Sequence, residues 1–128
     1  MSETHPLVRF ETFALIAIGG FAGSNLRYFA GLVVPGLPGT LLVNALGSFV
    51  LGFVLYEAIY AGLLSGETRF VVATGFLSSF TTYSTFALQS AQSAPMWAVG
   101  NVVANYALGF TGVVVGRALA KLIDGGGA

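Results

Sequence analysis

The stretch SSFTTYST, from Ser78 to Thr85, carries six Ser or Thr hydroxyls and one Tyr phenol in eight positions. It lies within a segment from Phe70 to Gly116 that contains no Asp, Glu, Lys or Arg. A single Ser or Thr in a membrane helix commonly bonds to a backbone carbonyl one turn earlier. Six hydroxyls this close together favour an interrupted helix, because they can satisfy the backbone groups that unwinding frees. The stretch therefore predicts a break in the helix that contains it.

The composition of the whole chain indicates a membrane protein. Of its 128 residues, 55% are hydrophobic and 8% are charged, and the mean hydropathy is +0.85. Soluble domains carry about 25% charged residues, so this chain could not cover a soluble surface. The formal net charge of 0 gives no electrostatic basis for binding nucleic acid. There is no cysteine for a disulfide or a thiolate metal site.

Four membrane-spanning helices fit the apolar segments, since about 20 residues of helix cross a bilayer. The expected spans are residues 10–34, 40–60, 69–89 and 96–121, within a single membrane domain of residues 1–128. The segment PGLPG, Pro35 to Gly39, separates the first two spans, and QSAQSAP, Gln89 to Pro95, separates the last two. The predicted fold is an all-α membrane protein whose third helix is broken near the bilayer midplane.

Lys and Arg are concentrated at one end of this arrangement. Arg9, Arg69, Arg117 and Lys121 fall on the side of the two termini, and only Arg27 can be counted toward the other side. Cytoplasmic loops carry an excess of Lys and Arg. The termini are therefore expected to be cytoplasmic, in a multi-pass protein of the cell membrane.

Small residues recur four positions apart on three of the expected helices, a spacing that lets helix backbones approach closely in lipid. These contacts could lie within one chain or between two subunits. Four helices enclose little interior, so a transport path would form more naturally between two copies, which favours a dimer. The pairs are Gly19 and Gly23, Ser48 and Gly52, and Gly112 and Gly116.

A few polar residues lie inside the expected spans. Arg27 either reaches the lipid headgroups or forms a cationic entrance that concentrates anions. Asn44 offers two amide donors and must bond a neighbouring helix or line a wet path, because an unpaired amide in hydrocarbon is costly. Asn101 and Asn105 share one face of the fourth span. No acid–base pair lies within the spans and His5 is in the polar N-terminus, so we expect no enzyme activity.

The order and spacing of these residues resemble those of the Fluc (CrcB) fluoride channels along nearly the whole chain. The segments that carry the resemblance are GGFAGSNLRY (Gly19 to Tyr28), GTLLVNALGSF (Gly39 to Phe49), GFLSSFTTYSTF (Gly75 to Phe86) and NVVANYALGF (Asn101 to Phe110). The resemblance implies a dual-topology, antiparallel dimer with two fluoride pores and a structural sodium ion at the dimer interface. It also implies a fluoride-selective channel that passively exports cytoplasmic fluoride and lowers its toxicity.

The resemblance also implies roles for individual residues. Asn44 is similar to the pore asparagine of the family, and Tyr83 and Phe86 fall at the positions of two phenylalanines whose ring edges line the pores. Ser78 and Thr81 fall at the positions whose backbone carbonyls bind sodium. A narrow fluoride pore must replace lost water with donors and ring edges. The remaining residues expected at the pore are Thr82, Ser84 and Asn105, with Arg27 at its entrance.

The chain departs from the family pattern at several of these places. Tyr83 replaces a phenylalanine, Ser78 and Ser79 replace a glycine pair, and Gly109 and Val113 stand where the family often has hydroxyl residues. Sodium binding by backbone carbonyls tolerates the serines if the backbone path is kept.

Three alternatives follow from the sequence. A small multidrug-resistance-type transporter has the same size and topology but needs an acidic residue deep in the membrane to exchange protons. Here Glu11 and Glu57 lie near span ends, which argues against it. The chain could also be a non-conducting partner subunit. Its uneven Lys and Arg distribution further leaves open an antiparallel dimer with an oppositely oriented homologue instead of with itself.

Overall fold

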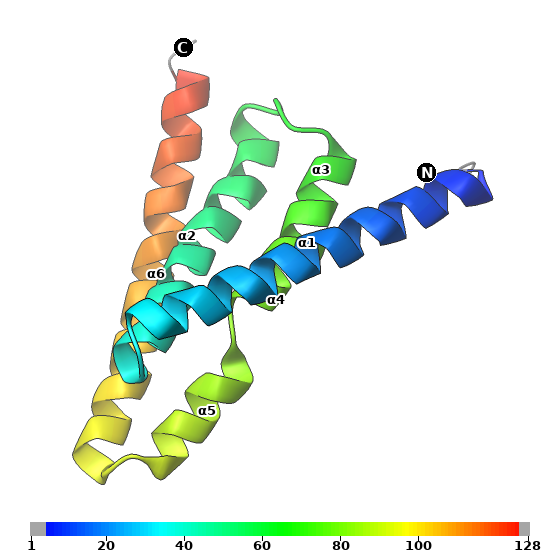
Figure 1. Ribbon diagram of the computed structural model, residues 1–128. Coiled ribbons are helices and arrows are strands. Elements are labelled where there is room, and N and C mark those ends of the chain that lie inside the picture. Colours follow the sequence, from blue (N-terminus) through cyan, green and yellow to red (C-terminus); the bar gives the residue numbers. More distant parts are fainter. Residues whose placement is uncertain (1–4, 126–128) are drawn as a thin grey trace.

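Residues 5–125 are described by the computed structural model, and every regular element among them is helical (Figure 1). Three helices are long: α1 (Pro6–Val33), α2 (Leu37–Tyr60) and α6 (Pro95–Gly125). Each of the three contains a segment long and apolar enough to cross a membrane. This confirms the all-helical membrane class that the composition predicts.

The chain between α2 and α6 is helical but interrupted. Helix α3 (Gly66–Phe70), the π-helix η1 (Val71–Leu77) and α4 (Ser78–Phe80) follow one another directly. Thr81 and Thr82 are extended, and α5 (Tyr83–Gln92) then resumes. Neither part has the length of about 20 residues that crosses a bilayer, so a crossing here needs both parts.

Local chemistry sets the helix boundaries, which differ in detail from the expected spans. Helix α1 begins at Pro6, before residue 10, because His5 Nδ1 accepts the Leu7 N–H at 3.1 Å and proline suits the first turn. Helix α2 begins inside PGLPG because Gly36 takes a φ of 77°, which glycine adopts readily. The turn between α5 and α6 is shorter than Gln89 to Pro95, since α5 continues to Gln92 and Pro95 opens α6.

Glycines allow two close helix contacts within the chain. Between α2 and α6, a Cβ added to Gly116 would overlap the Phe49 carbonyl, and one added to Gly52 would lie 2.7 Å from the Val113 backbone. Between α1 and η1, a Cβ on Gly23 would overlap the Phe76 carbonyl oxygen. These glycines therefore pack inside one subunit, which is one of the two alternatives for their spacing.

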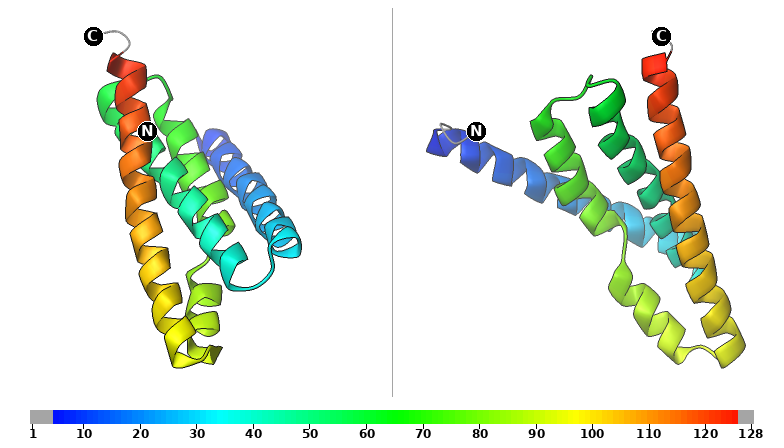
Figure 2. Two further views of the ribbon diagram at one scale, coloured as in Figure 1. Left: turned by 90° about the vertical axis from the view of Figure 1, so that its left-hand side faces the viewer. Right: turned by 180° about the vertical axis from the view of Figure 1, so that it is seen from behind.

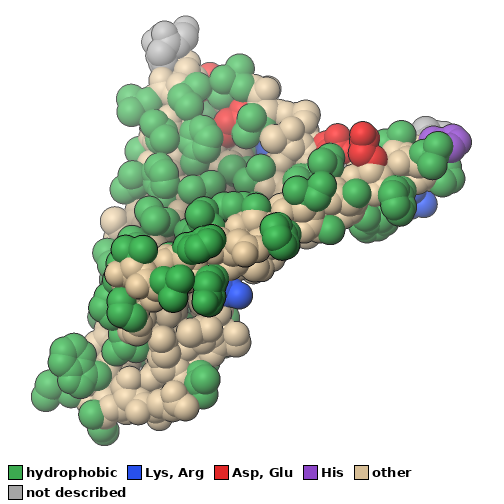
Figure 3. Space-filling model, viewed as in Figure 1, with side chains coloured by type: hydrophobic (Ala, Val, Ile, Leu, Met, Phe, Trp, Pro, Cys, Tyr) green, Lys and Arg blue, Asp and Glu red, His purple; other side chains and the backbone are tan. Residues whose placement is uncertain are grey.

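The helices form a loose bundle with α1 lying obliquely across it (Figure 1). The N-terminal end of α1 projects away from the other helices, as the view from behind shows (Figure 2). Thr12 Oγ1 donates a hydrogen bond of 2.7 Å to Glu67 Oε2, which links the N-terminal half of α1 to α3. Hydrophobic side chains are spread over the whole visible surface and charged ones are few (Figure 3), as expected for contact with lipid or another subunit.

Candidate functional site

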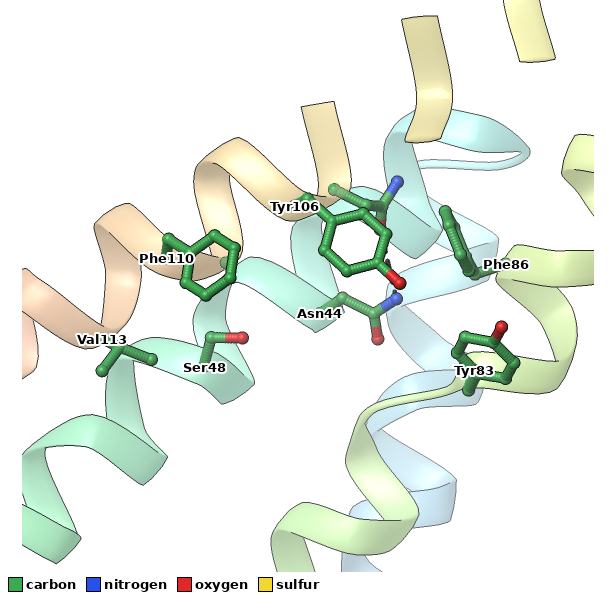
Figure 4. Close-up of a pocket in the computed structure, with 9 residues that line it drawn as sticks. Asn44, Ser48, Tyr83, Phe86, Tyr106, Phe110 and Val113 are labelled. Carbon is green, nitrogen blue, oxygen red and sulfur yellow. Dashed lines mark hydrogen bonds between the residues drawn. The ribbon is translucent and has the colours of Figure 1, made fainter. Parts of the chain in front are cut away.

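A cavity of about 300 Å³ lies between α2, α5 and α6 (Figure 4). Asparagine amides, hydroxyls and aromatic rings line it, and none of its residues is formally charged. Tyr83 is 73% exposed, so the cavity is a groove on the surface of the single chain. The lining residues are Asn44, Ser48, Tyr83, Phe86, Asn105, Tyr106, Gly109, Phe110 and Val113.

Aromatic rings form one wall of the groove. The Tyr83 and Phe86 rings are 5.7 Å apart between centroids with an interplanar angle of 53°. Phe86 meets Tyr106 edge to face, with centroids 6.3 Å apart and an angle of 80°. Phe86 is 7% exposed, so its ring is held in place by this packing. Ring edges carry partial positive charge, which suits contact with an anion.

Asn44 joins α2 to the interruption between α4 and α5. Its Oδ1 accepts the Thr82 N–H at 2.8 Å, and its Nδ2 donates to the Thr82 carbonyl at 3.1 Å. The side-chain amide thus pairs with both backbone polar groups of one residue, Thr82, in the way that a neighbouring strand would. Nδ2 also donates to Asn105 Oδ1 at 3.3 Å. Asn44 is therefore a structural partner of the extended residues as well as a lining residue of the groove.

The interruption leaves backbone carbonyls without their usual helical donors, among them those of Ser78 and Thr81. In a continuous helix, the Thr82 and Thr85 N–H groups would donate to the carbonyls of Ser78 and Thr81. Here the Thr82 N–H donates to Asn44 Oδ1, and the Thr85 N–H donates to Thr82 Oγ1 at 3.2 Å. Thr81 has φ −82° and ψ 161°, and Thr82 has φ −148° and ψ 116°. Two threonines and one asparagine thus redirect the local backbone bonding.

Ser78 and Thr81 line a second cavity, of about 400 Å³, between α2 and the interrupted segment. The hydroxyl of Ser78 donates to the Thr74 carbonyl, and that of Thr81 donates to the Leu77 carbonyl at 2.9 Å. Both hydroxyl hydrogens are thereby used one turn earlier in the chain. If these residues bind an ion, the carbonyls that have lost their helical donors are candidate ligands. The described residues contain no group of three or more His, Cys, Asp or Glu side chains that could hold a metal.

Arg27 lies apart from the groove, in a third cavity of about 360 Å³ between α1, the start of α2 and α5. Ser24, Thr40, Thr85 and Gln89 are among its other lining residues. This cavity shares Thr82 with the second one but shares no residue with the groove. If Arg27 forms an entrance to the groove of its own chain, an ion must therefore pass from the third cavity, across the interruption, to the groove.

The two remaining predicted pore residues do not line the groove. Thr82 is 6% exposed and lines the second and third cavities, while its hydroxyl caps α5 through the Thr85 N–H. Ser84 lies 3.4 Å from Thr82 through their hydroxyl oxygens and lines none of the three cavities. The structure brings together Asn44, Tyr83, Phe86 and Asn105 of the predicted set.

The sequence reasoning missed Ser48, Tyr106 and Phe110 as groove residues. The spacing of these residues in the sequence could have identified them. Ser48 follows Asn44 by one helical turn, and Phe110 follows Tyr106 in the same way, so each pair shares a face with its neighbour. Tyr106 also directly follows Asn105, an expected pore residue.

The buried acid of the chain has a structural role at the end of α2. Glu57 is 1% exposed and its Oε1 accepts from Arg69 Nε at 3.1 Å. Its Oε2 accepts from the backbone N–H groups of Leu63 and Leu64, the latter at 2.9 Å. These bonds tie the loop after α2 to the start of the interrupted segment and leave Glu57 remote from the groove lining.

The fold and the groove together define a helical membrane protein with an uncharged polar groove on one face. The family model described as "CrcB-like protein, Camphor Resistance (CrcB)" matches residues 14–117. The chain belongs to this family. It is 60% identical to the "Fluoride-specific ion channel FluC 1" of Haloarcula marismortui over 127 residues, 99% of each chain. It is 50% identical to "Fluoride-specific ion channel FluC 2" of Halobacterium salinarum over 113 residues, 88% of each chain.

Proposed function

We propose that this protein is a fluoride-selective channel that lets cytoplasmic fluoride leave the cell passively and so lowers its toxicity. The observation that carries the proposal is the 60% identity, over 99% of both chains, to a protein named as a fluoride-specific ion channel. The groove supports it chemically. Fluoride is small and strongly hydrated, so a pore must offer donors in place of water. The groove provides amides, hydroxyls and ring edges without a fixed charge that would trap the ion.

In the proposed channel, the groove is one wall of a pore that a second subunit completes. The groove opens on the surface, and Tyr83 and Phe110 are 73% and 69% exposed beside it. The second subunit is inverted, giving an antiparallel dimer with two equivalent pores. The interrupted helix crosses the membrane with its break, Thr81 and Thr82, near the midplane. Non-helical backbone at that depth is tolerated where protein buries it or where it lines a cavity.

Within the groove, the donors to fluoride are the hydroxyls of Ser48 and Tyr106 together with the ring edges of Tyr83 and Phe86. Asn44 can donate to the ion only by giving up a hydrogen bond to Thr82 or Asn105.

A structural sodium ion at the dimer interface completes the proposal. Its ligands in this chain are the carbonyls of Ser78 and Thr81, which have lost their usual helical donors. Carbonyl oxygens are suitable ligands for a hard cation, and unwound helices supply such ligands in other membrane proteins. The ion would hold the two interrupted segments together and fix their backbone path.

Orientation in the cell membrane follows from charge. The termini are placed in the cytoplasm, together with Arg9, Arg69, Arg117 and Lys121. Arg27 then lies toward the opposite side in one subunit and toward the cytoplasm in its inverted partner, where it attracts anions to a pore entrance. The partner is a second copy of this chain or an oppositely oriented homologue.

The proposal is tested by reconstituting the purified protein into liposomes loaded with fluoride and following release with a fluoride electrode. We expect rapid fluoride release and little chloride release. Release no faster than from protein-free liposomes, both for this chain alone and after co-reconstitution with its homologue, would overturn the proposal. Proton-coupled uptake of a cationic drug would instead indicate the multidrug transporter class, which the pairing of Glu57 with Arg69 disfavours.

A further inference from the structure

A continuous chain of hydrogen bonds leads from the interruption to the far end of α5. The Thr82 N–H donates to Asn44 Oδ1 at 2.8 Å, and Asn44 Nδ2 donates to Asn105 Oδ1 at 3.3 Å. Asn105 Nδ2 donates to Asn101 Oδ1 at 3.0 Å and to the Asn101 carbonyl at 2.8 Å. Asn101 Nδ2 then donates to Ser90 Oγ at 2.9 Å. The chain connects α2, α6 and α5.

The first donor determines the direction of every later bond. A backbone N–H can only donate, so the oxygen of Asn44 must face Thr82, and its nitrogen must face Asn105. The same reasoning turns the oxygen of Asn105 toward Asn44 and its nitrogen toward Asn101. The three amides are consequently aligned head to tail. Aligned hydrogen bonds polarise and strengthen one another in an interior of low dielectric constant.

The two amides in the middle of this series of hydrogen bonds, Asn44 and Asn105, use all of their Nδ2 hydrogens. Neither amide can therefore reorient without breaking a bond. Both Nδ2 hydrogens of Asn44 have acceptors, on Thr82 and Asn105. Both Nδ2 hydrogens of Asn105 have acceptors on Asn101. Asn101 is 7% exposed, although it lines none of the three cavities described above. The buried Asn101 amide, which lies away from the groove, is therefore connected to the groove lining through the side chains of Asn105 and Asn44.

From this geometry we infer that Asn101, anchored by Ser90, is a positioning residue for the ion path. It acts on the groove through Asn105 and Asn44 and does not touch the ion. Without the Asn101 side chain, the Asn105 amide loses one of its two acceptors and is held only by the Asn101 backbone carbonyl, so it can turn more easily. A rotated Asn105 would present its nitrogen to the nitrogen of Asn44. Asn44 would then lose its 3.3 Å bond and keep only its two bonds to Thr82.

The inference rests on the proposed function for its effect on ions, but its structural part can be measured separately. The test variant is Asn101→Leu, which keeps the approximate volume and removes the amide. Its matched control is Asn25→Leu on α1, where the Asn25 amide donates only to the Phe21 carbonyl of its own helix, at 2.7 Å. Ser90→Ala and Ser90→Thr compare loss and retention of the terminal hydroxyl.

The first measurement is fluoride efflux per reconstituted dimer over a range of fluoride concentrations. We expect Asn101→Leu to lower the rate at least about tenfold and to raise the fluoride concentration at half-maximal rate. Ser90→Ala should have a smaller effect in the same direction, and Ser90→Thr should restore the rate. A variant that only melts at a lower temperature, with unchanged rate and half-maximal concentration per folded dimer, would overturn the inference.

The second measurement does not depend on conduction. In protein labelled with ¹⁵N-asparagine, the side-chain amide signals of Asn44 should be protected from hydrogen exchange, with the assignment made by Asn44→Ala. Asn101→Leu should remove the protection of the Asn44 hydrogen that donates to Asn105, and Asn25→Leu should not. Unchanged protection in Asn101→Leu would contradict the inference. An absence of fluoride efflux from the wild-type protein would contradict the proposed function while leaving this measurement able to decide.

Discussion

At the scale of single residues, Asn44 combines two tasks that the sequence could not separate. Its amide pairs with both backbone polar groups of Thr82 and also lines the groove. Removing it would leave the Thr82 backbone N–H unpaired, at a cost of about 1–3 kcal/mol. A loss of activity in Asn44→Ala would therefore combine damage to the interruption with loss of a donor to the ion. Phe86 allows a cleaner test of the groove.

We predict that Phe86→Ile slows fluoride efflux at least about tenfold, which corresponds to about 1.4 kcal/mol. The substitution keeps an apolar side chain against Tyr106 but removes the ring edge. Liposome efflux per dimer measures the effect, with Phe13→Ile on the exposed surface of α1 as the control. Equal rates for the two variants would rule out Phe86 as a pore residue.

Tyr83 allows a second prediction, because its ring and its hydroxyl can be tested apart. Tyr83→Phe should keep the efflux rate within about twofold, since the ring edge that faces the groove is unchanged. If efflux instead falls by a larger factor, the Tyr83 hydroxyl is a donor that this chain requires. The comparison uses the same liposome measurement with the wild-type protein as reference.

At the scale of elements, the interruption between α4 and α5 is produced by side chains that replace backbone partners. Thr82 Oγ1 caps α5, and Asn44 supplies the pairing that a helix would have supplied. The π-helix before it packs against glycines of α1, so its position is set from outside the segment. The path of Thr81 and Thr82 is thus determined by α1 and α2 as much as by the local sequence.

For Thr81, we predict that Thr81→Ser is nearly silent and that Thr81→Pro abolishes fluoride efflux together with any dependence of it on sodium. Serine keeps the hydroxyl bond to the Leu77 carbonyl, whereas proline removes the backbone bond from the Thr81 N–H to that carbonyl, which is 3.0 Å long. Proline also disfavours the helical conformation of the preceding residue, Phe80. Efflux measured with sodium and with a large organic cation tests this. Equal losses in both variants would point to the side chain instead of the backbone.

The contact between α1 and η1 supports a prediction about stability. Gly23→Ala should lower the melting temperature of the purified protein, because the added methyl meets the Phe76 carbonyl oxygen and forces the helices apart. Overpacking of this kind costs about 1–3 kcal/mol. Gly31→Ala on the same helix is the matched control, since nothing lies within 4 Å of its added Cβ. Identical melting curves for the two variants would refute the close contact.

At the scale of the whole molecule, the groove is open and the chain is asymmetric in charge. A homodimer of inverted subunits requires insertion in both orientations at similar frequency, which needs balanced Lys and Arg. Arg9, Arg69, Arg117 and Lys121 lie on the side of the termini, and this favours one orientation. An oppositely oriented homologue would then be the more suitable partner.

We therefore predict that a reporter fused to the C-terminus of the chain, expressed alone, is found mainly in the cytoplasm. The side of the reporter is read by a cytoplasm-specific fluorescence and a periplasm-specific enzyme assay on parallel fusions. Arg117→Gln together with Lys121→Gln should move the distribution toward an even split. A near-equal split in the unmodified chain, with robust efflux from the purified single chain, would exclude the need for a second homologue.

The sequence by itself determined the membrane class, the approximate spans and the position of the polar interruption. These depend on local properties, namely hydropathy, proline and glycine at turns, and the density of hydroxyls at Ser78 to Thr85. The resemblance that the sequence carries also pointed to Asn44, Tyr83, Phe86 and Asn105, which the structure places around one groove.

Only the tertiary structure decided what those residues bond and which others join them. Asn44 meets Thr82 because α2 packs directly beneath the interruption, where Gly47 leaves room for the Thr81 methyl group. Tyr106 enters the groove because glycines bring α6 close to α2. Such contacts join residues far apart in the chain, and hydropathy and turn chemistry carry no information about which distant surfaces meet. The direction of the hydrogen bonds between the three asparagines is likewise set by the contact of the Thr82 N–H with Asn44, which exists only in the folded chain.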